Sequence, residues 1–269
     1  HPVATRADID YILGHINKVV STPLTHDDVV GVYAGLRPLL AGDSDETSKL
    51  SREHIVSNPA PGVTIVAGGK WTTYRVMAED AVDAAVNDLP WALAARVPAS
   101  VTAKVALLGA DGYAAALNRR AEWARRTGLG PYQITRLLGR YGSEIEAIVD
   151  LIEAQPTLAA TLPGTKDYRE AEVVFAARYE MALHLDDVLM RRTRLVFESR
   201  DRAIQAADRT AVLMAAELGW DAERTTREIA DYTARATAEL AAEQTGNDIE
   251  AEAAWHQVAD AAVGKDGFA

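Results

Sequence analysis

The residues that could do chemistry gather in one short turn: Gly68, Gly69, Lys70, Thr72 and Thr73. A β-branched run at 63–67 precedes them and is typical of a buried strand, and an apolar-periodic run at 76–86 follows and is typical of a helix. Glycine permits close backbone approach, the first N–H groups of a helix lack acceptors within the helix, and the helix dipole favours negative charge. We therefore predict a site here for a ligand oxygen or an electron-rich ring.

Two arginines upstream could complete such a site. Arg37 stands in a Gly-Leu-Arg-Pro-Leu turn, and Arg52 stands in a Ser-Arg-Glu-His segment. A guanidinium group suits a phosphate because its planar fork donates two parallel hydrogen bonds. Structural alternatives stay open: Arg37 could cap a carbonyl or pair with Asp43, Arg52 could be an exposed charge at a strand edge, and Lys70 could be a surface lysine.

In this order, the Gly-Leu-Arg-Pro-Leu, Ser-Arg-Glu-His and Gly-Gly-Lys-Trp-Thr-Thr-Tyr-Arg segments resemble the FAD-dependent, quinone-linked glycerol-3-phosphate dehydrogenases. In the second half of the chain, Tyr168-Arg-Glu-Ala-Glu-Val-Val and the segment 180–194 are similar to the helical C-terminal domain of that family. The resemblance covers nearly the whole chain.

This resemblance implies an activity and a set of site residues. The family oxidises sn-glycerol 3-phosphate to dihydroxyacetone phosphate, passing a hydride to FAD and electrons to quinone. The resemblance implies that Arg37 and Arg52 contact the substrate phosphate. It also implies that Lys70 stabilises the substrate oxygen or the reduced flavin. The implied catalytic residues are thus Lys70, Arg37 and Arg52. A related glycerophosphate oxidase that uses oxygen is an alternative.

The resemblance also implies contacts with the cofactor. Gly68, Gly69, Lys70, Thr72 and Thr73 are the implied FAD-binding residues, with ordinary N-capping as the structural alternative for the threonines. A Gly-x-Gly-x-x-Gly dinucleotide loop is not found in the chain, which opens His1-Pro-Val. We therefore expect the C-terminal part of a longer enzyme, inactive alone, with most of the FAD site upstream.

Composition limits the remaining functions. The net charge of −11 argues against nonspecific nucleic-acid binding. The absence of cysteine excludes disulfides and thiolate metal sites and suits a cytoplasmic protein. The six histidines show no ligand spacing, so no metal is expected.

Positive charge is concentrated in two places. Six arginines fall between residues 119 and 140, and three more at 191, 192 and 194. Ion pairs or a solvated helix face would explain both groups. The sharper alternative is docking on an anionic membrane surface or on another subunit, which suits a family whose electrons go to membrane quinone. The resemblance also implies a homodimer and peripheral membrane association. On that view residues 95–269 would be an interaction module.

The chain is predicted to be α+β at its start and all-helical afterwards. Residues 1–92 would be the C-terminal part of the FAD-binding and substrate domain, and residues 93–269 a helical domain. Expected elements of the first domain are a helix capped by Thr5 and Asp8, strands at 27–34, 52–57 and 63–67, and a helix at 73–87. Proline does not occur after Pro163, which favours long helices.

Some polar residues have two interpretations. His54 would share a strand face with Arg52 and is a tempting base, although a base upstream of the chain is the better expectation. His184 is expected to be buried and bonded to Asp187 or a carbonyl. The pair Asp186 and Asp187 is expected to cap a helix or pair with Arg191 or Arg192. The apolar stretch 173–185 is placed at the centre of the helical domain.

Overall fold

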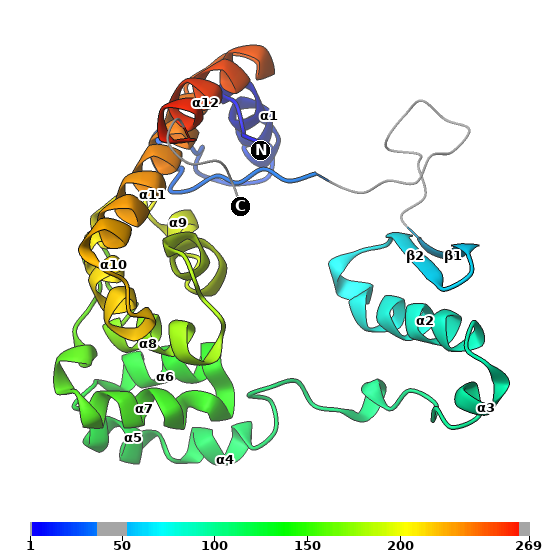
Figure 1. The fold of residues 1–269 in the computed structure, drawn as a ribbon. Helices are drawn as coiled ribbons and strands as arrows, with labels where there is room; N and C mark the ends of the chain where they lie inside the picture. Colours follow the sequence, from blue (N-terminus) through cyan, green and yellow to red (C-terminus); the bar gives the residue numbers. More distant parts are fainter. Residues whose placement is uncertain (1, 37–52, 264–269) are drawn as a thin grey trace. The chain divides into compact units, whose positions relative to one another are not determined.

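The computed structural model describes residues 2–36 and 53–263 (Figure 1). The chain forms two compact units, one made of His1–Ala34 with Leu108–Ala269 and one made of Gly35–Leu107. We call them the helical unit and the inserted unit, because the second interrupts the first in sequence. The predicted domain boundary after residue 92 stays a prediction.

The predicted fold class is confirmed, because short strands and a helix are followed by helices alone. The described part of the inserted unit consists of β1 (His54–Ala60), β2 (Val63–Gly68), a 3-10 helix (Trp71–Thr73), α2 (Tyr74–Asn87), α3 (Trp91–Ala94) and a 3-10 helix (Thr102–Lys104). The helices of the helical unit are α1 (Arg6–Ile16), α4 (Tyr113–Asn118), α5 (Arg120–Thr127), α6 (Pro131–Tyr141), α7 (Ile145–Ala154), α8 (Glu170–Tyr179), a π-helix (Asp187–Arg192), α9 (Leu195–Glu198), α10 (Ile204–Leu218), α11 (Ala222–Ala242) and α12 (Asp248–Val263). Three further 3-10 helices lie in this unit, at His26–Asp28, Gly142–Glu144 and Pro156–Ala159.

The β1–β2 hairpin forms where the sequence predicts two strands. The strands are antiparallel, with His54 opposite Gly68, and β1 continues to Ala60, so the turn is shorter than expected. The prediction that the second strand is buried is wrong among the described residues, since Ile65 is 47% exposed. Helix α2 contacts both strands of this two-stranded sheet, and the outward side chains have no second described layer to cover them.

Helix α1 begins where its sequence signal places it. The Thr5 hydroxyl accepts from the N–H of Asp8 at 3.2 Å, and the Asp8 carboxylate accepts from the N–H of Thr5 at 2.9 Å. This capping box satisfies donors that the first turn of the helix leaves open. The N–H of Arg6 donates to the carbonyl of Thr245 at 3.0 Å, which joins α1 to the chain just after α11.

The strand expected at 27–34 is wrong. A 3-10 helix forms at His26–Asp28, because the Asp28 carboxylate accepts from the N–H of Thr25 at 2.8 Å. Residues 29–34 pair with no described strand. Gly31 instead lies directly against the backbone of Phe197 in α9, at a position where a β-carbon would collide with the Phe197 carbonyl.

The core of the helical unit lies between α5, α6, α7, α8 and α10, which Figure 1 shows packed side by side. Its largest fully buried apolar side chains include Trp123, Ile134, Leu137, Ile148 and Leu189. The central placement of 173–185 is confirmed for Val173–Ala176, Ala182 and Leu185, whereas Met181 and Leu183 are exposed. The helix has ended before these two exposed residues, and Met181 has a positive φ of 55°.

Within the described ranges no helix combines the length and the apolar character needed to cross a bilayer.

Candidate functional site

Lys70 lies in the turn that joins β2 to α2. Gly68 ends β2 with φ 78° and Gly69 follows with φ 77°, values that favour glycine. Lys70 is exposed and immediately precedes the 3-10 helix Trp71–Thr73, which leads into α2. Lys70 therefore stands directly before a helix, as the sequence predicts, and its contact with a ligand stays a prediction.

Hydrogen bonds within the turn fix its backbone. The N–H of Gly69 donates to the carbonyl of Glu53 at 3.3 Å. The Thr73 hydroxyl donates to the carbonyl of Lys70 at 3.0 Å and accepts from its N–H at 3.3 Å. Thr73 thus acts as a local cap, and its contact with a cofactor stays a prediction, as does that of Thr72.

Gly69 is also confined by its neighbours. A β-carbon at this position would lie 2.5 Å from the Met77 sulfur and 3.1 Å from the β-carbon of His54. The turn is therefore held between a side chain of α2 and a side chain of β1. This packing explains the glycine without reference to any ligand.

Replacing Gly69 with alanine is expected to destabilise the protein by about 1–3 kcal/mol, because alanine is strained at positive φ and would displace Met77. Gly62→Ala is a matched control, since Gly62 has the same φ of 77° and no neighbouring atom within 4 Å of the added carbon. Urea unfolding of both variants measures the difference. Equal losses would show that packing at Gly69 contributes nothing.

The side chains of Trp71 and Arg75, which follow Lys70, are held by contacts within the inserted unit. Trp71 stacks on Tyr74 with ring centroids 5.4 Å apart. Arg75 pairs with Glu79 at 2.6 Å and donates to Thr102, so its guanidinium group is held by contacts within the inserted unit. These contacts leave Lys70 as the cation of the turn that a ligand could meet.

Arg37 and Arg52 lie outside the described residues, so the common pocket of the three cations stays a prediction. His54, two residues after Arg52, is described: its Nε2 atom lies 2.7 Å from the Asp80 carboxylate in α2. The side chain considered as a base is therefore hydrogen-bonded to a carboxylate, which links β1 to α2.

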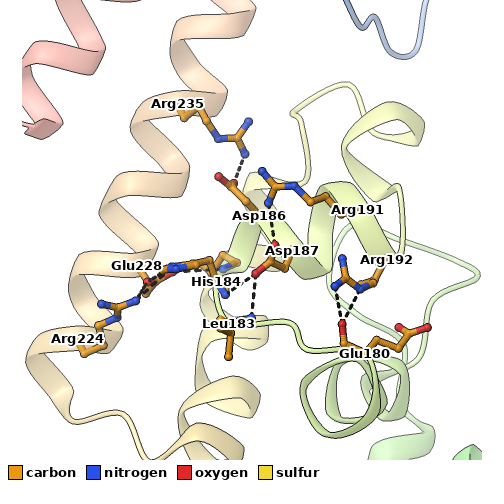
Figure 2. A network of polar contacts seen from close by, with 11 residues as sticks. Glu180, Leu183, His184, Asp186, Asp187, Arg191, Arg192, Arg224, Glu228 and Arg235 are labelled. Atoms are coloured by element: carbon orange, nitrogen blue, oxygen red, sulfur yellow. Dashed lines mark hydrogen bonds and ion pairs between the residues drawn. The ribbon is translucent and has the colours of Figure 1, made fainter. Parts of the chain in front are cut away.

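A second polar cluster lies in the helical unit (Figure 2). The Asp187 carboxylate accepts from the N–H groups of Leu183 and His184 at 2.9 and 3.0 Å and pairs with Arg191 at 2.9 Å. Asp186 pairs with Arg235 of α11. The predicted capping and ion-pair roles are confirmed for Asp187, whereas Asp186 forms an ion pair with Arg235 rather than with Arg191 or Arg192.

His184 differs from its prediction. Its side chain is 57% exposed, and its Nδ1 atom lies 2.8 Å from Glu228 of α11 rather than from Asp187 (Figure 2). Glu228 also pairs with Arg224 at 2.5 Å. A partner 44 residues away could not be read from the local sequence.

Neighbouring groups and burial shift two carboxylate pKa values in this cluster. Burial opposes ionisation of Asp187, but the hydrogen bonds from Leu183 and His184 and the charge of Arg191 outweigh it, so the pKa of Asp187 is lowered. Burial raises the pKa of Glu180, although Arg192 opposes this. The cluster joins the loop after α8 to α11 and gives no sign of a substrate site.

A buried carboxylate was missed by the sequence reasoning. Glu172 of α8 is fully buried, accepts from the Tyr141 hydroxyl at 3.0 Å and pairs with Arg140 at 3.0 Å. The N–H of Arg169 donates to its second oxygen at 2.6 Å. Burial raises the pKa of Glu172, with Arg140 acting in the opposite sense. The available signal was a glutamate beside an apolar run, which needs partners if buried.

Most of the arginines between residues 119 and 140 form ion pairs with acidic side chains of the helical unit. Four of them form ion pairs there, which confirms that explanation for these members: Arg119–Glu122, Arg126–Asp150, Arg136–Asp167 and Arg140–Glu172. Docking on an anionic surface remains a proposal, and these four guanidinium groups already have acidic partners. In the described part of the chain no group of acidic and histidine side chains is arranged to hold a metal ion.

Comparisons with known proteins agree with the resemblance. Residues 100–225 match the family described as the C-terminal domain of alpha-glycerophosphate oxidase. The chain is 50% identical over 252 residues to "Glycerol-3-phosphate dehydrogenase 2" of Mycobacterium tuberculosis, covering 94% of the chain and 42% of that protein. It is 49% identical over the same length to "Glycerol-3-phosphate dehydrogenase" of Mycobacterium leprae, again covering 94% of the chain and 42% of the relative.

A distant relative shows the same pattern. The human "Glycerol-3-phosphate dehydrogenase, mitochondrial" is 32% identical over 228 residues, which covers 82% of the chain and 30% of the human protein. The chain thus spans less than half the length of these relatives. By these matches and its helical second half, the chain belongs to the glycerol-3-phosphate dehydrogenase and glycerophosphate oxidase family and carries its C-terminal domain.

Proposed function

We propose that this chain is the C-terminal part of an FAD-dependent enzyme that oxidises sn-glycerol 3-phosphate to dihydroxyacetone phosphate. The observation that carries the proposal is the 50% identity, over 94% of the chain, to a protein named glycerol-3-phosphate dehydrogenase. The position of Lys70 at an exposed helix start supports it, because an ammonium group there can stabilise a negative oxygen.

The residues of this chain would bind and orient rather than supply the redox chemistry. When bound, FAD accepts the hydride from the substrate carbon. Gly68, Gly69 and the first turn after Lys70 would hold the cofactor, and the observed turn fits this role because it presents Lys70 and Thr72 at the surface. Lys70 would stabilise negative charge on the substrate oxygen or the reduced cofactor.

Arg37 and Arg52 would bind the substrate phosphate in this proposal. A guanidinium group donates two parallel hydrogen bonds to phosphate oxygens, and two such groups would offset a dianion. This fixes the substrate end that is not oxidised, and binding at that end orients the reacting carbon.

The proposed electron acceptor is quinone, with a homodimeric enzyme that is cytoplasmic and peripheral at the membrane. Support comes from the resemblance to quinone-linked dehydrogenases. Oxygen is the second candidate acceptor, and the description of the matching family as an alpha-glycerophosphate oxidase favours it.

The test uses the complete enzyme that contains this chain. Glycerol 3-phosphate is expected to bleach the visible flavin absorbance without oxygen, whereas glycerol at the same concentration is expected to leave it unchanged, because glycerol lacks the phosphate. Rapid recovery of the absorbance with a soluble quinone would support the dehydrogenase, and recovery only with oxygen would support the oxidase. A colourless enzyme, or one bleached equally by both compounds, would contradict the proposal.

A further inference from the structure

The turn that carries Lys70 is supported from two sides by elements that are themselves joined. On one side, the carbonyl of Glu53, the residue before β1, accepts from the N–H of Gly69 at 3.3 Å, and β1 supplies the β-carbon of His54. On the other side, α2 supplies the Met77 sulfur. Gly69 has room for hydrogen alone between them, so any change in the spacing of β1 and α2 must move the turn.

A hydrogen bond between two side chains joins β1 to α2 beside the turn. His54 Nε2 lies 2.7 Å from Asp80 Oδ2, and Asp80 follows Met77 by three residues on α2, which places both on one helix face. His54 is also the residue of β1 that lies opposite Gly68 in the hairpin register. The pair therefore sets the distance between strand and helix beside the glycine turn.

Both side chains of the His54–Asp80 pair are partly open to water, so the pair can orient the turn while contributing little to the stability of the protein. The side chains of His54 and Asp80 are 20% and 48% exposed, and a polar contact so open to water contributes little to stability. It does restrict how β1 and α2 sit on either side of Gly69. Its loss should change where the turn points more than whether the protein folds.

We infer that His54 and Asp80 are positioning residues for Lys70, holding the Gly68–Gly69 turn so that the ammonium group meets the reacting oxygen. This inference rests on the proposed function of Lys70. Neither side chain need touch the substrate. Asp80 acts through His54, and His54 acts through its packing against Gly69.

The test compares two aspartates on the same helix in the complete enzyme. Asp80→Ala removes the pair, and Asp83→Ala removes an exposed carboxylate from α2, so both variants change the net charge equally. We expect Asp80→Ala to lower kcat about tenfold, since a misplacement of about 1 Å can cost ~10²-fold, with little change in KM for glycerol 3-phosphate. Asp83→Ala should keep the parent kcat. Asp80→Asn should recover most of the loss, because its amide oxygen still accepts from the imidazole N–H.

A second background distinguishes positioning from general damage. In a Lys70→Ala enzyme, adding Asp80→Ala should cause no further loss of kcat, because the group being positioned is gone. The positioning role alone would be overturned if Asp80→Ala lowered kcat in the Lys70→Ala enzyme by the same factor as in the parent enzyme. It would also be overturned if the single variants Asp80→Ala and Asp83→Ala had the same kcat. Parent-like activity of the single Lys70→Ala variant would overturn the proposed site itself. Unfolding midpoints of both aspartate variants are expected to agree, and a large drop for Asp80→Ala only would also count against the inference.

Discussion

Lys70→Ala in the complete enzyme is expected to lower kcat by about 10²–10³-fold, the usual cost of removing one preorganised group that stabilises a developing negative charge. The expected reason is the position of the ammonium group, exposed at a helix start and fixed by the Gly68–Gly69 turn. Because the charge develops in the transition state, KM should change much less than kcat. Steady-state kinetics with glycerol 3-phosphate would measure both.

Lys104→Ala provides the control for this prediction. Lys104 is also an exposed lysine of the inserted unit, and it ends a 3-10 helix away from the glycine turn in sequence. It should keep the parent kcat. If Lys70→Ala and Lys104→Ala behave alike, Lys70 is a surface lysine and its assignment to the site is wrong.

Glu172→Ala is expected to destabilise the protein by about 3–5 kcal/mol, the range for removing one partner of a buried ion pair. Glu172 is fully buried. Its carboxylate accepts from the Tyr141 hydroxyl and from the N–H of Arg169, and it forms an ion pair with the Arg140 guanidinium group. Its removal would leave the Tyr141 hydroxyl and the Arg169 N–H without this acceptor inside the core, and Arg140 without its acidic partner. Urea unfolding followed by circular dichroism would measure the loss.

Glu146→Ala is the matched comparison for Glu172. Glu146 lies on α7 with a side chain that is 52% exposed, and its pair with Arg119 spans 3.6 Å. Solvent replaces most of such a contact, so a change below about 1 kcal/mol is expected. Similar losses for the two variants would mean that the buried cluster carries no special weight.

Local signals in the sequence predicted local structure well. The Thr5 and Asp8 spacing located the start of α1, and two β-branched runs located β1 and β2. The segment 27–34 failed because its β-branched residues favour extension, whereas its actual partner is the backbone of Phe197, far along the chain. Pairing of that kind has no signature in neighbouring residues.

The candidate site divides in the same way. The glycine turn and Lys70 were predictable because strand, turn and helix are consecutive. The confinement of Gly69 by Met77 and the link between His54 and Asp80 were not, because they depend on how α2 lies on the hairpin. For His184 the sequence pointed to a neighbour, and the structure supplies Glu228 from another helix.

The attachment of α1 to the chain beside Thr245 has a consequence for synthesis. Helix α1 is synthesised more than two hundred residues before Thr245, so this docking must wait until α11 is complete. The same holds for Gly31, whose neighbour Phe197 is also made late. Residues 93–269 produced alone would lack their N-terminal cover, and a recombinant version of the helical unit therefore has to retain residues 1–34, joined to the later helices through a linker.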